Sequence, residues 1–191
     1  MPIDIFLVLA SNSLVAGRTY TFSLLLEVTN DSRFSPGLAS LPVSVNVPPA
    51  NGKLDVSPAE GFAIDDVFYL SSSNWVDDDP SSVLTYYFGY FADPDLNTDG
   101  MSIASLRRDA KPLSTLSFTN DLRTRLPVPT NGTRLQLVVF VTDSNGATSF
   151  STQVVIAKVP EDTERAANLI GGVVNRRLAE QDSPGVVSAA R

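Results

Sequence analysis

The chain has 191 residues, of which 43% are hydrophobic, so it can form one large or two small domains with packed cores. Its 21 acidic and 14 basic residues give a net charge of −7, which argues against a nucleic-acid surface and a polybasic membrane-surface helix. The chain contains no Cys and no His. This excludes thiolate or imidazole zinc sites, iron–sulfur clusters, haem with His or Cys ligands, and nucleophilic systems that pair Ser or Cys with His.

The first apolar run is Ile5–Ala10, which follows Asp4. It is far shorter than the roughly 20 residues of a membrane span. It also lacks the basic region that begins a signal peptide. We interpret it as a β-strand and expect no signal peptide or transmembrane segment in this chain.

Short runs rich in β-branched and aromatic residues then alternate with turns rich in Gly and Pro. The predicted strands are 19–26, 41–47, 53–56, 67–70, 84–91, 134–141 and 151–157. Runs of this length between turn signals predict an all-β sandwich fold. No helical segment is expected before position 160, so βαβ units are not expected.

Two segments share a pattern that indicates an internal repeat. One runs from Leu14 to Val45 and the other from Val128 to Ile156, and each leads from a turn through two strands. Both resemble the last hairpin of a sandwich, the F and G strands, and such self-similarity indicates tandem modules. In the second hairpin Asn145-Gly146 suits a tight turn, because both residue types tolerate positive φ.

The spacing of the hairpins predicts the domain boundaries. Residues 1–47 hold about half of a sandwich, whereas a whole module needs about 100 residues. We therefore predict the C-terminal part of a first β-sandwich over 1–47 and a complete one over 48–159; a single larger sandwich is the alternative. Residues 160–191 are predicted to form an amphipathic helix over 161–178 and a frayed tail, as the start of a downstream domain. The apolar residues at helical spacing are Ala166, Leu169, Ile170, Val173, Val174 and Leu178.

Three adjacent carboxylates, Asp77, Asp78 and Asp79, are candidate calcium ligands, because Ca²⁺ takes several oxygen ligands. The favoured interpretation is a solvated acidic loop in which Pro80 sets the turn. The spacing does not match an EF-hand loop. We expect no metal and no cofactor.

The aromatic residues favour a packed core. Trp75 is interpreted as a core anchor at a strand end. Alternation along 84–91 sends neighbouring aromatic residues to opposite faces, for core packing or, as the alternative, for a sugar- or protein-binding face. Tyr86, Phe88 and Tyr90 share one face, and Tyr87 and Phe91 share the other.

Neither catalysis nor export has a strong signal in the residues. A glycosidase needs two carboxylates across a cleft, and no segment predicts a cleft, so we expect no enzyme activity. Two sequons, at Asn30 and Asn131, lie in predicted loops. They permit N-glycosylation if the protein is exported.

A series of residues after the first hairpin resembles the receptor for egg jelly (REJ) module in order and spacing, over about residues 10–159. The series consists of Asn46-Val47-Pro48-Pro49, Gly52, Pro58, Gly61, Phe68, Trp75-Val76-Asp77-Asp78, Leu84-Thr85-Tyr86-Tyr87-Phe88 and Val141-Thr142-Asp143-Ser144-Asn145-Gly146-Ala147.

This resemblance implies tandem Ig-like or fibronectin-III-like sandwiches in the extracellular part of polycystin-type membrane proteins and sperm egg-jelly receptors. It implies a non-catalytic structural and recognition module, part of a larger membrane-anchored protein, that binds a protein or glycan. Pro48 and Pro49 would restrict bending between sandwiches. The structural roles implied by the resemblance fall on Trp75, Pro48, Pro49, Gly61, Phe68, Tyr86, Phe88 and Gly146. The alternative is a calcium-dependent adhesion or carbohydrate-binding sandwich that uses Asp77, Asp78 and Asp79.

Overall fold

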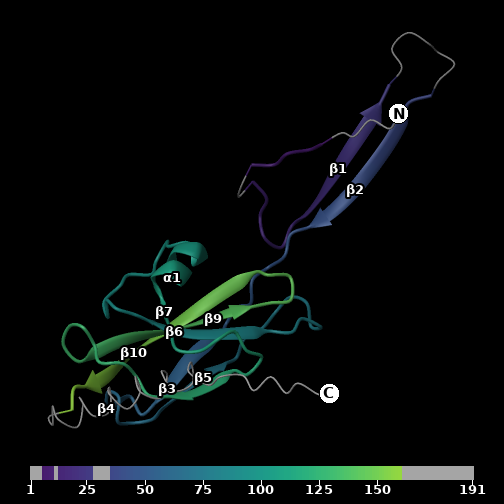
Figure 1. The fold of residues 1–191 in the computed structure, drawn as a ribbon. Helices are drawn as coiled ribbons and strands as arrows, with labels where there is room; N and C mark the ends of the chain where they lie inside the picture. Colours follow the sequence, from purple (N-terminus) through teal and green to yellow (C-terminus); the bar gives the residue numbers. More distant parts are fainter. Residues whose placement is uncertain (1–5, 11–12, 28–34, 161–191) are drawn as a thin grey trace, which may run out of the picture.

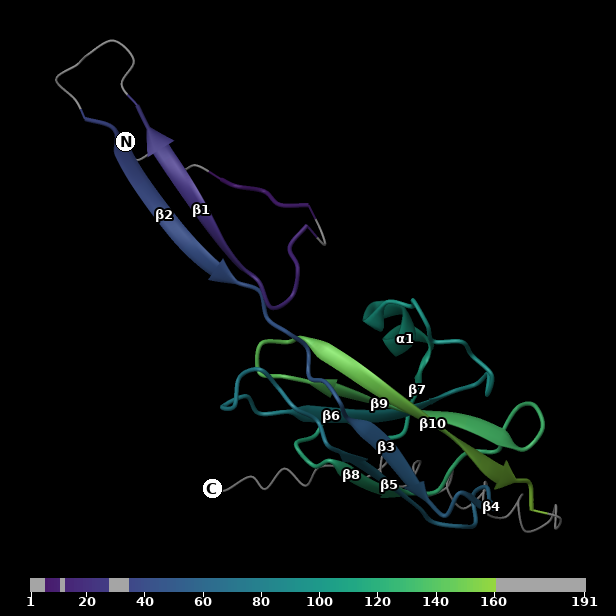
Figure 2. The same ribbon diagram turned by 180° about the vertical axis from the view of Figure 1, so that it is seen from behind.

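The computed structural model describes residues 6–10, 13–27 and 35–160. Strands β1 (Thr19–Leu26) and β2 (Gly37–Ser44) form an antiparallel N-terminal hairpin. This hairpin projects away from the other elements, which together form the body of the molecule, residues 50–160 (Figures 1 and 2). The helix predicted over 161–178 lies outside the described residues.

The body is built from two β-sheets that share one core. The five-stranded sheet has the order β4 (Glu60–Phe62), β10 (Thr148–Lys158), β9 (Arg134–Thr142), β6 (Thr85–Phe91) and β7 (Lys111–Pro112). The three-stranded sheet has the order β3 (Lys53–Ser57), β5 (Phe68–Ser73) and β8 (Asp121–Thr124). Within the described residues all strand pairs are antiparallel, except that β4 runs parallel to β10.

Strand β9 is the centre of the body because both of its faces are buried. Leu137 and Val139 point into the core shared with Phe68 and Leu70 of the three-stranded sheet. Val138 and Phe140 point to the opposite face and pack in a second cluster. A strand covered on both faces has a continuous apolar sequence, as the run from Leu137 to Val141 has.

The second cluster is covered by a helix that the sequence interpretation did not include. Helix α1 (Ile103–Asp109) begins after Ser102, whose side chain accepts a hydrogen bond from the backbone N–H of Ser105. Its Leu106 is fully buried beside Phe140. The expectation of no helix before position 160 was therefore wrong, because two helical turns are too short to show a clear 3.6-residue period. The helix connects β6 to β7, which pair antiparallel, so it forms no βαβ unit.

The strands confirm the all-β fold class, with differences at weak points of the pattern. All seven runs predicted after residue 18 correspond to strands, although β2 begins at Gly37 and β10 begins at Thr148, both earlier than expected. Residues 6–10 are not a regular strand, contrary to our interpretation. The strands that the pattern missed are β4, β7 and β8, which have 3, 2 and 4 residues. Such short strands show too few alternations to be recognised.

Trp75 joins the start of the body to the end of β5. Its indole N–H donates to the Oγ of buried Ser72 at 2.7 Å. The ring covers Gly52 so closely that a Cβ at this position would lie 1.9 Å from the indole Cδ2. Next to the ring, Ala50 and Val76 exchange two backbone hydrogen bonds of 2.8 and 2.9 Å.

We predict that Gly52→Ala destabilises the body by roughly 1–3 kcal/mol, the range for an inserted methyl group in a packed site. Equilibrium urea unfolding followed by Trp75 fluorescence measures this change. Gly37→Ala is the control, because its Cβ would meet only Leu26 Cβ, at 3.9 Å. Equal unfolding midpoints for Gly52→Ala and the parent protein would show that the indole does not hold this position.

Candidate functional site

The linker between the hairpin and the body is short and rich in proline. The last backbone bond of the hairpin runs from Val45 N–H to the Arg18 carbonyl, and the first bond of the body is made by Ala50. Only residues 46–49 lie between them, and they include half-buried Pro48 and buried Pro49. Proline fixes φ near −65°, so this linker has few conformations.

A hydrogen bond between side chains connects this linker to the far end of the sequence. The Asn46 amide Nδ2 donates to Asp143 Oδ2 at 2.6 Å. Asp143 is only 5% exposed and follows the end of β9. Asn46 and Asp143 thus hold the linker against the β9–β10 turn, and we call this pair the joint.

The same carboxylate also shapes the turn. Asp143 Oδ1 accepts the backbone N–H groups of Asn145 and Ala147, both at 2.9 Å. Gly146 adopts φ 90° at the tip, a conformation that glycine takes without strain. One oxygen of Asp143 therefore fixes the turn, and the other fixes the linker.

Asn46 and Asp143 both fall within the REJ-like pattern, but the sequence did not predict their contact. They are 97 residues apart. The occurrence of both in that pattern was the one signal that could have suggested the pairing.

The acidic loop uses its carboxylates to form turns. Asp77 Oδ1 accepts the N–H of Asp79 at 3.0 Å, and Asp79 Oδ1 accepts both the N–H and the Oγ of Ser81. The hydrogen bonds from Ser81 lower the pKa of Asp79 below its ordinary value. Asp77 Oδ2 is buried without a hydrogen-bond partner, and Asp78 is exposed. Among the described residues, no group of three His, Cys, Asp or Glu side chains is placed to hold a metal ion.

The other residues singled out from the sequence lie at scattered positions rather than in one site. Phe68 and Phe88 are 0% and 2% exposed in the shared core. Gly61 lies against Phe68, whose Cζ would be 2.9 Å from an added Cβ. Tyr86 packs at the edge of this core, and burial raises its pKa above the ordinary 10.0.

The two sequons differ in what the structure describes. Asn131 is exposed, in the turn that precedes β9, where a glycan could be attached. Asn30 lies outside the described residues.

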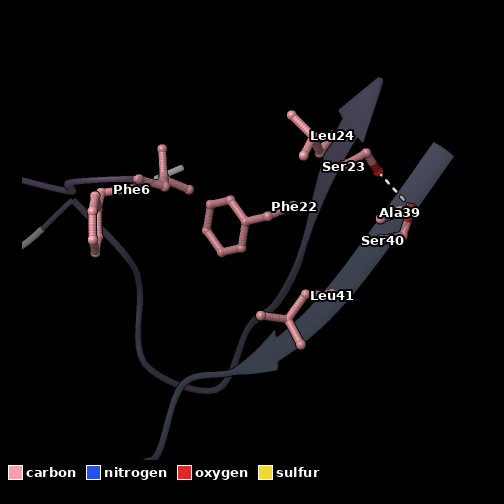
Figure 3. A pocket seen from close by; sticks show the side chains of 8 residues that line it. Phe6, Phe22, Ser23, Leu24, Ala39, Ser40 and Leu41 are labelled. Atoms are coloured by element: carbon pink, nitrogen blue, oxygen red, sulfur yellow. Dashed lines mark hydrogen bonds between the residues drawn. The ribbon is translucent and has the colours of Figure 1, made fainter. Parts of the chain in front are cut away.

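An exposed apolar feature that the sequence did not predict lies on the N-terminal hairpin. A cavity of about 550 Å³ lies between one face of the hairpin and the segment that begins at Phe6. Figure 3 shows the Phe6 ring turned towards Phe22 across this space. The lining residues are Phe6, Leu7, Phe22, Ser23, Leu24, Ala39, Ser40 and Leu41.

We predict that Asn46→Ala frees the direction of the hairpin without unfolding the body. Asp143 keeps its two turn bonds but loses one donor to a buried charged oxygen, so we expect the body to stay folded and to lose about 1.5–3 kcal/mol. Residual dipolar couplings of hairpin and body amides should fit one alignment tensor in the parent protein and require two in the variant. Ser82→Ala is the control, because it removes the Ser82–Ser144 bond on the same turn without touching the linker. A single tensor in Asn46→Ala would contradict a role for the joint.

We also predict that millimolar Ca²⁺ leaves the melting temperature unchanged, because turn donors already occupy one oxygen each of Asp77 and Asp79. A site saturated at 100 times its Kd would instead add about 2.7 kcal/mol of stability. Differential scanning calorimetry with and without Ca²⁺ makes the measurement. A rise in melting temperature with Ca²⁺ that is lost in Asp77→Asn would contradict this prediction and support a calcium site in the acidic loop.

Comparison with known proteins places these features in a family. The comparison with curated proteins gives no match. Among solved structures, the domains d3–d4 of the rat CD45 extracellular region give a TM-score of 0.34 at 13% identity, covering 81% of this chain and 77% of that chain. The family profile described as REJ domain matches residues 4–190. It spans the N-terminal hairpin, the joint and the body, and the chain therefore belongs to the REJ domain family.

Proposed function

We propose that this chain is a non-catalytic structural and recognition module on the extracellular side of a larger, polycystin-type membrane protein. The observation that carries the proposal is the REJ domain match over residues 4–190. In the described part of the chain, no helix has the length and apolar character needed to cross a membrane.

The strand order supports an Ig-like or fibronectin-III-like sandwich for the body. In such folds strands A, B and E form one sheet and strands C, F and G form the other. Strands β3, β5 and β8 correspond to A, B and E, and β6, β9 and β10 correspond to C, F and G. In this assignment, β7 is an added edge strand beside C.

We propose the same sandwich type for the N-terminal part, with residues 1–47 as the end of a first sandwich, residues 48–159 as a complete second one and residues 160–191 as the start of a following domain. The β1–β2 hairpin supports the first assignment, because two strands alone cannot enclose a core.

The mechanism that we propose is display of loops in a fixed direction. Pro48 and Pro49 limit the linker, and the Asn46–Asp143 bond holds it to the β9–β10 turn. A protein or glycan ligand would then bind exposed loops or strand faces of a rigid array. The chain lacks His and Cys, which supports a non-catalytic role.

The test is where the native protein is found. Antibodies raised against the body should stain intact, non-permeabilised source cells, because the module is expected outside the membrane. Staining that requires permeabilisation would contradict the proposal.

Glycosylation gives a second, residue-specific measurement. We predict that native protein carries an N-glycan at exposed Asn131, and that Asn131→Gln removes the glycosidase-sensitive mass shift of this site. Asn145→Gln is the control, because Asn145 is also exposed in a turn but is not in a sequon. A peptide that contains unmodified Asn131 in all of the native protein would show that the site is not used.

A further inference from the structure

The N-terminal hairpin has one face that mixes polar and apolar residues and one face that is apolar throughout. Residues directly opposite each other in an antiparallel pair share a face. Thr19 and Ser44 bond through their hydroxyls at 3.0 Å, and Ser23 and Ser40 do so at 2.8 Å (Figure 3). These four hydroxyls satisfy one another, and the same face also carries Thr21, Pro42, Leu25 and Leu38, of which Leu25 and Leu38 are 57% and 70% exposed. The opposite face carries Tyr20, Phe22, Leu24, Leu26, Ala39, Leu41 and Val43.

The apolar face is poorly covered. Leu24, Leu26 and Leu41 are 48%, 67% and 64% exposed. Neither β1 nor β2 contains a charged residue. Contiguous exposed apolar surface of this kind marks an interaction site, and the absence of charge indicates that its partner surface is apolar as well.

The two edges of the hairpin are not equivalent. Val45 N–H donates to the Arg18 carbonyl, and this pair continues the register of Thr19 with Ser44. Because hydrogen-bonded and non-hydrogen-bonded pairs alternate, Thr21 and Ser23 direct their N–H groups away from β2. On β2 the corresponding outward position is Pro42, which has no N–H. The β1 edge can therefore accept another strand along its length, whereas Pro42 interrupts the β2 edge, as is typical of the last strand of a sheet.

The β9–β10 hairpin of the body shows what pairs with the edge of β9, which corresponds to the open edge of β1. There Asp143 and Ala147 form a hydrogen-bonded pair, so Val139 and Val141 also belong to such pairs, and both face the core. In the same way, Phe22 and Leu24 belong to the hydrogen-bonded pairs of β1 and lie on its apolar face. In both hairpins, therefore, the residues of the hydrogen-bonded pairs lie on the face that is core-facing in the body and apolar in the N-terminal hairpin. The outer edge of β9 is filled by antiparallel β6.

A second correspondence lies before each hairpin. In the body, β8 precedes β9 by the connection 125–133 and belongs to the facing sheet, where Leu122 packs against the core. Before β1, the connection 11–18 has a similar length, and the segment 6–10 places Phe6 and Leu7 at the cavity on the apolar face. The segment 6–10 therefore lies on the same side of its hairpin as β8 does in the body, although it is not a regular strand.

We propose that the β1 edge is a docking site for an antiparallel β-strand, uncharged and apolar on the side of Phe22, that comes from the same polypeptide N-terminal to Phe6. The chain order of the body carries the choice of source, since every strand that covers or flanks β9 and β10 precedes β9. The strand takes the place that β6 has in the body, where β6 extends the sheet beside β9. A facing sheet, which in the body is β3–β5–β8, would then cover the apolar face on the side of residues 6–10. This inference rests on the proposed tandem sandwiches, but its test is independent of where the protein is located.

The test compares amide hydrogen exchange in the 191-residue chain and in the protein translated from the full native transcript. In the longer protein, the outward amides of Thr21, Ser23 and Leu25 should exchange roughly 100-fold more slowly than in the 191-residue chain. The outward amides of Ser40 and Ser44, on the β2 edge, should exchange at the same rate in both. Amides of β9 are the internal control, because β6 already protects them in the shorter chain.

Two matched variants identify the edge. Ser23 and Ser40 are cross-strand partners, so Ser23→Pro and Ser40→Pro remove the same hydroxyl bond and leave the β1–β2 backbone bonds in place. In the longer protein, Ser23→Pro should abolish the protection of Thr21 and Leu25, whereas Ser40→Pro should preserve it. Calorimetry should show an unchanged transition for the body in both variants.

Every other outcome overturns the proposal. Equal effects of the two variants would show that β1 is not the docking edge. Protection of β1 in the 191-residue chain that disappears on dilution would assign the edge to a second copy. A native transcript that begins at Met1, or a longer protein whose β1 amides exchange freely, would show that no N-terminal strand docks there.

Discussion

The burial of β9 on both faces is the constraint on which the rest of the structure depends. Its odd-numbered residues, such as Leu137 and Val139, fill the core between the two sheets, and the even-numbered Val138 and Phe140 fill the space beneath α1. Fully burying each such side chain contributes about 1.5–3 kcal/mol. The strand is long enough for β6 and β10 to pair along most of it, so it aligns both.

That alignment also positions the joint. Asp143 directly follows β9. Its carboxylate reaches the linker because β9 ends on the side of the body where the linker enters. Burial to 5% exposure strengthens the dependence, since a carboxylate in such a place needs hydrogen-bond donors. Two turn N–H groups and the Asn46 amide supply them. Stability of the body and the direction of the N-terminal hairpin are thus connected through one side chain.

The N-terminal hairpin and the β9–β10 hairpin of the body are both antiparallel, but they differ in what surrounds them. In the body the hairpin is flanked by β6, faced by a second sheet and covered by α1. The N-terminal hairpin is apolar throughout on one face only, and outside its own strands just Phe6 and Leu7 line the cavity on that face. The REJ domain match includes both the hairpin and the body. In our proposal the hairpin ends a first sandwich and the body is a complete second one.

The sequence by itself determined the all-β class, the long strands, the two hairpins and the family, because alternating apolar residues and Gly- and Pro-rich turns are local signals. Short elements escaped it for the same reason: α1, β4 and β7 have too few residues to show a period. The alternation of Tyr86, Phe88 and Tyr90 against Tyr87 and Phe91 also followed from the local pattern, as the two core clusters show.

Only the tertiary structure decided how distant residues are used. Asn46 meets Asp143 across 97 residues of sequence, and Trp75 covers Gly52, because the packing of two sheets brings strand ends together. It also decided the use of the acidic loop, where Asp77 and Asp79 bind turn N–H groups. The β1 and β2 edges differ because of the N–H groups that point outward from each. The hydrogen-bond register sets which N–H groups these are, and composition does not encode the register.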